Sequence, residues 1–195
     1  MRSDFSSGKR NRRAGSEQTS PAKSEPPNRR SDTNADRTLE DSRGILRNSA
    51  KAIIIRDGYL LAIRNVDPAG DWYILPGGGQ RFGETLTEAL KRECLEEAGA
   101  GVRVGRLLLV REYIGKNHEF SDHDGEAHQI EFMFECEIVG DYSPRDGHLP
   151  DQYQTGVTWL PIGELEKHRL YPKALTGILK KGLNSTSPAY LGDVN

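Results

Sequence analysis

Three acidic residues, Glu93, Glu96 and Glu97, follow the glycines at positions 77–79 and are the residues best suited to chemistry. Residues three and four positions apart lie on one face of a helix, so the three carboxylates should converge. They also continue the apolar side of that helix, where crowded carboxylates repel one another and are poorly solvated. A hard divalent cation would relieve this conflict, because oxygen ligands suit Mg²⁺ or Mn²⁺. The spacing therefore predicts a metal site.

Local signals delimit the helix that carries these acids. Thr85 and Glu88 form a capping-box pattern, which predicts that the helix begins near Leu86. Gly99 fits a left-handed cap and predicts where the helix ends. The glycines at 77–79 permit positive φ and close backbone approach, so main-chain carbonyls and amides are expected beside the acids.

The spacing of the acids belongs to a longer pattern that starts at Gly78. From there the chain reads G-x5-E-x7-R-E-U-x-E-E-x-G-U, with Glu84 as the first acid and Arg92 as the arginine. This pattern resembles the Nudix box, in which U is an apolar residue, and Cys94 and Ala100 occupy the two U positions. The alternative is an ordinary amphipathic acidic helix after a tight turn.

The resemblance implies a metal-dependent pyrophosphohydrolase. Such an enzyme cleaves a phosphoanhydride in a nucleoside diphosphate linked to another group, so a small nucleotide-type substrate is expected, either a nucleoside triphosphate or a nucleotide-sugar. The resemblance implies that Glu93, Glu96 and Glu97 bind Mg²⁺, or Mn²⁺, together with the carbonyl of Gly77 or Gly78. The metal would neutralise the substrate and acidify a water for in-line attack on phosphorus.

Roles within the box follow from the same resemblance. A free carboxylate must accept the proton of the attacking water. We favour Glu93 for this role, with Glu97 and Glu131 as alternatives. Arg92 can pair with neighbouring acids and hold them in place, although a simple surface i,i+4 pair is the alternative. Glu84 is expected to support the glycine turn from behind the metal ligands. Glu131 is also expected to lie behind these ligands and not to bind the metal itself.

Residues outside the box are candidates for binding substrate. Arg64 and Arg111 lie in predicted strands, and each could clamp a phosphate bidentately or be an exposed strand arginine. Backbone groups of Gly77 and Gly79 are expected to approach the substrate.

Aromatic residues and a polar loop could complete the substrate site. Trp72, Tyr73 and Tyr113 could stack on a base or belong to the core. The loop 115–127 is long and polar, and it is either a solvated loop or a mobile flap over the site.

The elements that must position these residues follow from apolar periodicity. Asp57-Gly58 predicts a tight hairpin between its flanking strands. Strands are predicted at 51–56, 59–64, 72–75, 106–114, 128–138 and 157–160, and helices from Pro161 to about 168 and from Pro172 to about 181. Strands flanking one central helix indicate an α/β fold, and the Nudix resemblance, which covers about residues 48–182, implies an α/β/α sandwich with a mixed β-sheet.

The domain organisation is predicted in three parts. Residues 1–45 are polar and charged, so a disordered tail is expected, either a solvated linker or a basic binding segment. Residues 46–184 are expected to form the Nudix hydrolase domain and 185–195 a C-terminal extension. Removing residues 1–44 is expected to leave activity and melting temperature nearly unchanged.

Composition excludes several classes of function. A net charge of −2 gives no footprint for stable nucleic-acid binding, and no apolar run is long enough for a membrane span. We expect a cytoplasmic protein in which Cys94 and Cys136 are reduced and buried. The family resemblance makes a homodimer possible. The alternative to an enzyme is a catalytically silent Nudix domain that senses a nucleotide or docks a partner. The presence of all the box glutamates argues against this alternative.

Overall fold

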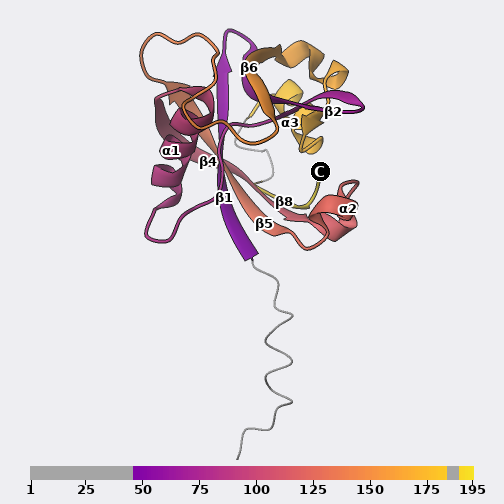
Figure 1. Ribbon diagram of the computed structural model, residues 1–195. Coiled ribbons are helices and arrows are strands. Elements are labelled where there is room, and N and C mark those ends of the chain that lie inside the picture. The colour runs from indigo at the N-terminus through magenta and orange to yellow at the C-terminus, as the bar shows by residue number, and fades with distance from the viewer. Residues whose placement is uncertain (1–45, 184–188) are drawn as a thin grey trace, which may run out of the picture. The chain divides into compact units, whose positions relative to one another are not determined.

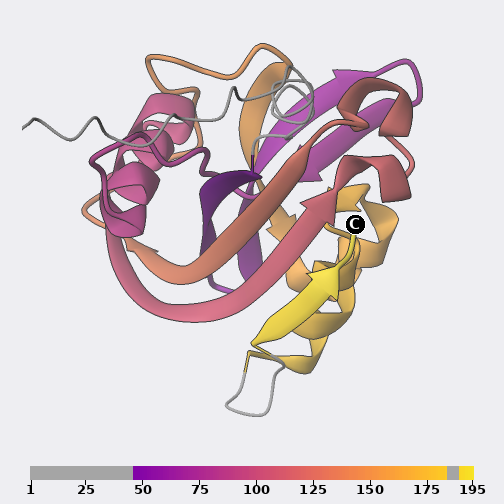
Figure 2. The ribbon, with the colours of Figure 1, turned by 90° about the horizontal axis from the view of Figure 1, so that it is seen from below.

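The computed structural model describes residues 46–183 and 189–195, so the expected tail 1–45 lies outside the described residues. One curled mixed sheet dominates the fold (Figures 1 and 2). Its strands are β1 (Leu46–Arg56), β2 (Tyr59–Asp67), β3 (Gly70–Ile74), β4 (Val102–Ile114), β5 (His128–Ile138), β6 (Gln154–Pro161), β7 (Leu170–Tyr171) and β8 (Tyr190–Asp193). The helical segments are α1 (Leu86–Ala98), η1 (Gly115–Asn117), α2 (Ser121–Asp124), η2 (Ile162–Lys167) and α3 (Ala174–Lys181).

Strand β1 lies at the centre of the sheet. The order is β7-β3-β2-β1-β5-β4-β8, and β6 pairs with β2 beside this path. Strand β1 runs antiparallel to β2 and parallel to β5, whereas β4 is antiparallel to β5 and parallel to β8. The predicted hairpin is present, since Asp57 and Gly58 have φ of 53° and 81° between β1 and β2.

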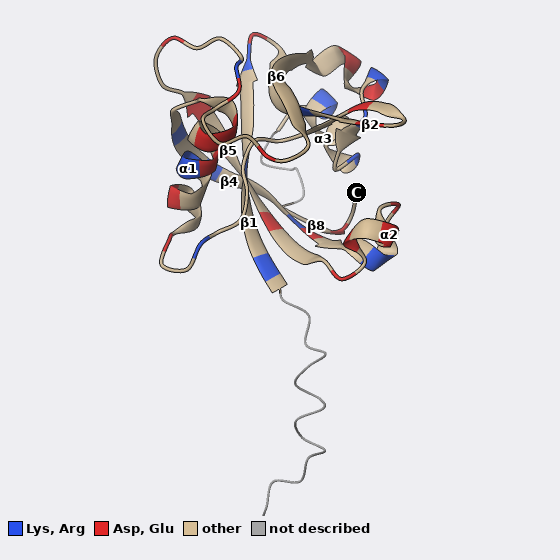
Figure 3. Ribbon diagram, viewed as in Figure 1, with Lys and Arg blue, Asp and Glu red and all other residues tan. Residues whose placement is uncertain are grey.

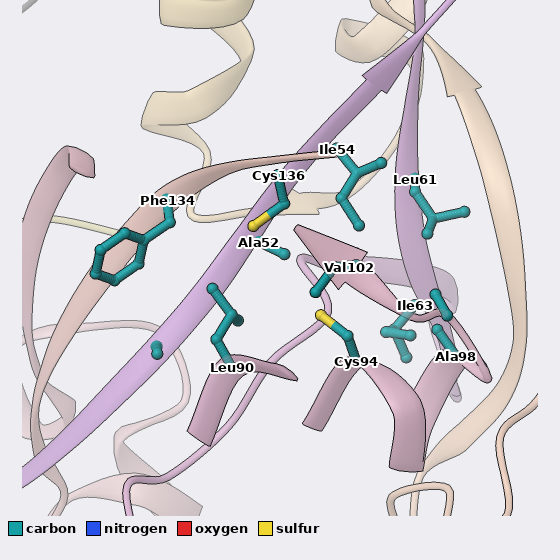
Figure 4. Close-up of a cluster of buried hydrophobic side chains, with 12 residues drawn as sticks. Ala52, Ile54, Leu61, Ile63, Leu90, Cys94, Ala98, Val102, Phe134 and Cys136 are labelled. Carbon is teal, nitrogen blue, oxygen red and sulfur yellow. The ribbon is translucent and has the colours of Figure 1, made fainter. Parts of the chain in front are cut away.

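Two hydrophobic cores lie on opposite faces of the sheet. Ala52 and Ile54 of β1 belong to the core beneath α1, whereas Ile53 between them belongs to the core with η2 and α3. This alternation follows from the period of two along a strand. Figure 4 shows Leu90 and Cys94 of α1 packed in the first core, and Cys94 and Cys136 are free and buried as expected. The α/β/α arrangement predicted for the fold is confirmed.

Helix α1 has the limits that its capping residues predict. Thr85 accepts a hydrogen bond from the Glu88 amide, the Glu88 side chain accepts one from the Thr85 amide, and Gly99 adopts φ of 58°. The segment after Pro161 is a short 3-10 helix, not the expected α-helix, because only six residues separate β6 from the next turn.

Two strands were not predicted. Strand β7 has two residues, and β8 lies within residues 185–195, which we expected as an extension. Strand β8 instead pairs with β4 as part of the sheet. Strands β1 and β4 also begin earlier than predicted, at Leu46 and Val102. None of the helices within the described ranges is long and apolar enough to cross a membrane.

Candidate active site

The glycine turn before α1 lies directly against β1. The carbonyl of Gly78 accepts hydrogen bonds from the Ala50 amide and the Ser49 hydroxyl, at 3.0 and 3.1 Å. Gly77 has φ of 124°, and a Cβ there would collide with the carbonyl of Ala50. A Cβ at Gly78 would lie 2.7 Å from the Glu93 carboxyl carbon. Glycine is therefore required at 77, where the turn is pressed against β1, whereas a side chain at 78 would displace the Glu93 carboxylate.

Arg92 holds the acids on one side of α1. Its guanidinium makes a bidentate pair with Glu84 at 2.7 and 2.9 Å, and also contacts Glu93 at 2.5 Å and Glu96 at 2.9 Å. A further hydrogen bond joins Arg92 to the carbonyl of Gly79 at 3.0 Å. The Arg92 hydrogen bonds, with one from the Arg81 amide, lower the pKa of Glu84 to about 2. The expected pairing is present, and its role in catalysis stays a prediction.

Glu97 lies on the buried side of the same helix. Its side chain accepts a hydrogen bond from the Gly77 amide at 2.9 Å, and only 2% of the residue is exposed. Burial raises the pKa of Glu97 to about 7, although the charge of Lys51 and the Gly77 hydrogen bond oppose the rise. The carboxylate is thus held against the glycine turn with little solvent to stabilise its charge.

Lys51 of β1 is a site residue that sequence reasoning missed. Its ammonium donates a hydrogen bond to the Gly77 carbonyl, and its charge lowers the pKa of both Glu97 and Glu131. The available signal was a lysine inside the otherwise apolar run from Ala50 to Ile54. A cation in the interior of a central strand needs acidic partners, which the sequence places elsewhere in the chain.

The donors around the turn fit a hard cation by their chemistry. Glu93 and Glu97 bring carboxylate oxygens against the glycine turn. The carbonyls of the turn already accept hydrogen bonds, that of Gly77 from Lys51 and that of Gly78 from the Ala50 amide and the Ser49 hydroxyl. Glu96 is directed to Arg92 and Arg81 instead. Among the residues that the structure describes, no three acidic, histidine or cysteine side chains form an assembled metal cluster. The predicted ligand set of Glu93, Glu96, Glu97 and Gly78 therefore stays a prediction.

A cavity of about 1110 Å³ opens beside Lys51. Charged groups from three central strands line one part of it, and aromatic residues line another. The lining includes Lys51, Arg111, Gln129, Glu131, Trp72, Tyr113, Phe120, Tyr171, Asp67, Asp122, His123, Asp124 and Asn195. Figure 3 shows the acidic residues of α1 and β5 on elements that border β1. A cavity of this size and lining can hold a nucleotide with a further group attached.

The two candidate phosphate-binding arginines have different surroundings. Arg111 lines the cavity but is buried, pairing with Glu131 at 2.5 Å and donating to the Val194 carbonyl at 2.6 Å. Arg64 is exposed on β2, lies 3.9 Å from Asp71, and is not part of the cavity lining. The structure therefore brings Arg111 to the cavity and leaves Arg64 outside it.

The aromatic candidates also divide. Trp72 lines the cavity, 6.4 Å from the ring of Phe120, whereas Tyr73 is buried in the second core. Tyr113 lines the cavity and stacks on His118 with ring centroids 5.2 Å apart. Because His118 and Arg111 already lie against the Tyr113 ring, Trp72 is the one of these three residues that is placed where a base could stack.

The loop 115–127, hereafter the flap, contains η1 and the short helix α2. Its Phe120, Asp122, His123 and Asp124 line the cavity. The flap is therefore a wall of the cavity and not only a solvated connection.

Comparisons with known sequences identify a family that this chain matches. A family model described as "NUDIX domain" matches residues 45–178. A curated ADP-ribose pyrophosphatase of Methanocaldococcus jannaschii is 35% identical over 89 residues, which are 45% of this chain and 48% of that protein. The matched region thus spans about half the length of this curated relative.

Solved structures resemble the fold at low sequence identity. A NUDIX hydrolase from Nitrosomonas europaea has a TM-score of 0.56 at 18% identity, covering 72% of this chain and 92% of the other. An ADP-ribose pyrophosphatase from Streptococcus suis has a TM-score of 0.51 at 19% identity, covering 75% and 97%. At these identities the likeness concerns the fold alone.

Proposed function

The chain belongs to the Nudix hydrolase family, and from this premise we propose that it is a Mg²⁺-dependent or Mn²⁺-dependent pyrophosphohydrolase. Its substrate is a nucleoside diphosphate linked to another group. The observation that carries the proposal is the glycine turn, which lies between Glu93 and Glu97 and beside the Lys51 ammonium. Lys51 also lines the large cavity and so connects the glycine turn to a space for the substrate, although Glu93 and Glu97 do not themselves line that cavity.

In this mechanism Glu93, Glu96, Glu97 and a carbonyl of the glycine turn would hold the metal. When bound, the ion would supply charge neutralisation and acidify a water. In the hydrolysis itself, a P–O bond from water forms as one phosphoanhydride P–O bond breaks, giving two phosphorylated products. Glu93 accepts the water's proton at Oε2, the oxygen that does not bond Arg92. Glu97 is the alternative base.

The other polar residues hold the acids in position or compensate negative charge. Arg92 fixes Glu84, Glu93 and Glu96 through its guanidinium hydrogen bonds. Lys51 faces the negative charge of the diphosphate from β1. Glu131 is a poorer base than Glu97, whose pKa burial raises. Burial alone would raise its pKa, but the charges of Arg111 and Lys51 and the Arg111 hydrogen bond lower it.

ADP-ribose is the first substrate to test, because the curated relative is an ADP-ribose pyrophosphatase. The cavity supports a substrate with a base and a second sugar. Trp72 and Phe120 offer aromatic faces, while Asp67 and Asp122 offer oxygens that can accept hydrogen bonds from sugar hydroxyls. One sequence feature disagrees, since a proline associated with ADP-ribose hydrolases is replaced by the residues around Gly115.

The test incubates the protein and Mg²⁺ or Mn²⁺ with ADP-ribose, other nucleotide-sugars and nucleoside triphosphates, and measures the phosphorylated products. We expect Glu97→Gln to lower kcat by about 100-fold or more while the melting temperature stays near that of the wild type. Glu137→Gln is the matched control, because Glu137 is exposed on β5 with only a surface pair to Arg103. Absence of turnover across the panel, or wild-type activity in Glu97→Gln, would contradict the proposal.

A further inference from the structure

The carboxylate of Asp193, at the end of β8, binds the first turn of the flap. One oxygen accepts a hydrogen bond from the Ile114 amide at 3.0 Å and lies 2.6 Å from His118 Nε2. The other oxygen accepts a hydrogen bond from the Asn117 side chain at 2.6 Å. Figures 1 and 2 both show the end of the chain beside α2. Asp193, near the C-terminus, thus contacts three residues at the start of the flap: Ile114, Asn117 and His118.

The strand that carries Asp193 is itself fixed to the sheet. Tyr190 donates a hydrogen bond from its hydroxyl to Glu112 at 2.8 Å, and the Val194 amide bonds the Glu112 carbonyl at 3.3 Å. Arg111 donates to the Val194 carbonyl at 2.6 Å. Because residues on both sides of Asp193 are held by β4, its carboxylate is a fixed point against which the flap can rest.

The contact with Asp193 is linked to the cavity wall through packed side chains. His118 stacks on Tyr113, with ring planes 11° apart, and the Tyr113 hydroxyl donates to Asp124 at 3.2 Å. Phe120, two residues after His118, packs against Tyr171 with ring centroids 5.2 Å apart. Tyr113, Phe120, Tyr171 and Asp124 all line the cavity. A shift of the flap entrance would therefore change the shape of the cavity.

The electrostatics of Asp193 agree with this arrangement. Desolvation opposes ionisation, but hydrogen bonds from Asn117, His118 and the Ile114 amide lower the pKa of Asp193 to about 2. The carboxylate is therefore ionised at neutral pH, and its hydrogen bonds to the flap are charge-assisted.

We propose that Asp193 is a positioning residue that holds the flap against the substrate cavity, so that the C-terminal strand determines substrate affinity. This inference rests on the proposed function for its effect on hydrolysis. Its structural part, the holding of the flap, does not depend on any substrate. Asp193 touches no reacting group, so its removal acts on binding more than on the chemical step.

The first experiment measures flap order in the full-length protein without substrate. Hydrogen exchange of residues 115–124 is compared among wild type, Asp193→Asn and Asp193→Ala. We expect exchange to become about tenfold faster or more in Asp193→Ala, and less so in Asp193→Asn, which keeps one acceptor. Asp141→Asn, an exposed acid in a loop, is the control and should match wild type. Unchanged exchange in Asp193→Ala would overturn the proposal.

The second experiment separates KM from kcat on the best substrate of the panel. We expect Asp193→Ala to raise KM about tenfold and to leave kcat within about twofold. The Asn117→Ala variant should raise KM less, because it removes only one of the contacts of Asp193. The double variant should match Asp193→Ala, because the contact with Asn117 is already lost in Asp193→Ala. Additive effects, or a fall in kcat at unchanged KM, would count against the proposal. If wild type cleaves nothing, the proposed function fails, and the exchange experiment still decides the flap contact.

Discussion

At the scale of single residues, the acids of the candidate site differ in how closely a cation compensates their charge. Glu131 pairs with Arg111 of β4, whereas Glu84, Glu93 and Glu96 share Arg92. Glu97 has only the Gly77 amide and the more distant charge of Lys51. The least compensated acid is therefore the one that faces the glycine turn, where a divalent cation would be most stabilising.

The buried pair of Arg111 and Glu131 gives a prediction about stability. Their side chains are 7% and 6% exposed, so Arg111→Met leaves an uncompensated charge in the interior. We expect the free energy of unfolding to fall by about 3–5 kcal/mol at pH 8, measured by urea unfolding. Without Arg111 the folded pKa of Glu131 would be raised, so the loss is largest above that raised value and shrinks as the pH falls from it toward the unfolded value, about 4.3. Below the unfolded value the loss shrinks further, because the wild type then loses the stabilisation that its lowered pKa supplies.

The double variant Arg111→Met with Glu131→Gln is the control for this prediction. It removes the isolated charge, so it should recover much of the stability lost in Arg111→Met. If the double variant is as unstable as the single one, the loss comes from packing around the Arg111 stem and from its bond to Val194. If Arg111→Met costs less than about 1 kcal/mol, the pair does not contribute as argued.

Sequence reasoning identified the box residues because their spacing is local. Helical periodicity alone places Glu93 and Glu97 on one face, and glycine has an identifiable reason to stand at 77 and 78. The place of Lys51 in the cavity lining and the position of Arg64 outside it could not be derived in this way. Which strand side chain faces a cavity depends on how strands far apart in the sequence pair, and no short stretch of sequence determines that pairing.

At the scale of elements, local signals predicted an element correctly where residues at its own ends fix where it begins and ends. Helix α1 is delimited by side chains that bond its own ends, so its first and last turns were predicted. Strand β8 has no such signal, because four residues with a glycine become a strand only when β4 is already beside them. The same holds for β7, which has two residues.

The capping box of α1 gives a prediction at this scale. Thr85→Ala removes the hydroxyl that accepts the Glu88 amide at 3.2 Å, and we expect a loss of about 1 kcal/mol in the free energy of unfolding. Lys91→Ala is the control, because Lys91 is exposed on the same helix and outside the cap, and it should cost less than about 0.5 kcal/mol. Thermal unfolding followed by circular dichroism measures both. Equal losses in the two variants would mean that the cap does not stabilise the helix.

At the scale of the whole molecule, the α/β class was predictable because strand alternation and one amphipathic helix suffice to assign opposite faces of a sheet. The curl of the sheet and the cavity between flap, β3 and the central strands were not predictable. The cavity depends on where the flap and the C-terminal strand rest, and those positions are fixed by tertiary contacts such as Asp193 with His118. The residues around the glycine turn were therefore easier to predict from the sequence than the residues that line the cavity.

Titration of the acids gives a prediction for the entire fold. Hydrogen bonds lower the folded pKa of Glu84 and of Asp193 to about 2, and Glu131 is also lowered. These groups stabilise the fold above their unfolded values, about 4, and lose that contribution as the pH falls toward 2. Glu97 has the opposite sign, since its folded pKa of about 7 costs stability above pH 7 and nothing below its unfolded value. We therefore expect stability to rise as the pH falls from 7 toward 5, because the cost from Glu97 disappears, and then to fall steeply between pH 4.5 and 2.

This dependence is measured by urea unfolding at constant ionic strength with a chelator present, so that metal binding contributes no protons. The double variant Glu84→Gln with Asp193→Asn should be less stable at pH 6 and should lose less stability between pH 4.5 and 2, because two of the lowered carboxylates are gone. Asp141→Asn should reproduce the wild-type curve, since that acid is exposed in a loop. An unfolding free energy that stays level or rises below pH 4.5 would show that these ionised pairs do not stabilise the fold.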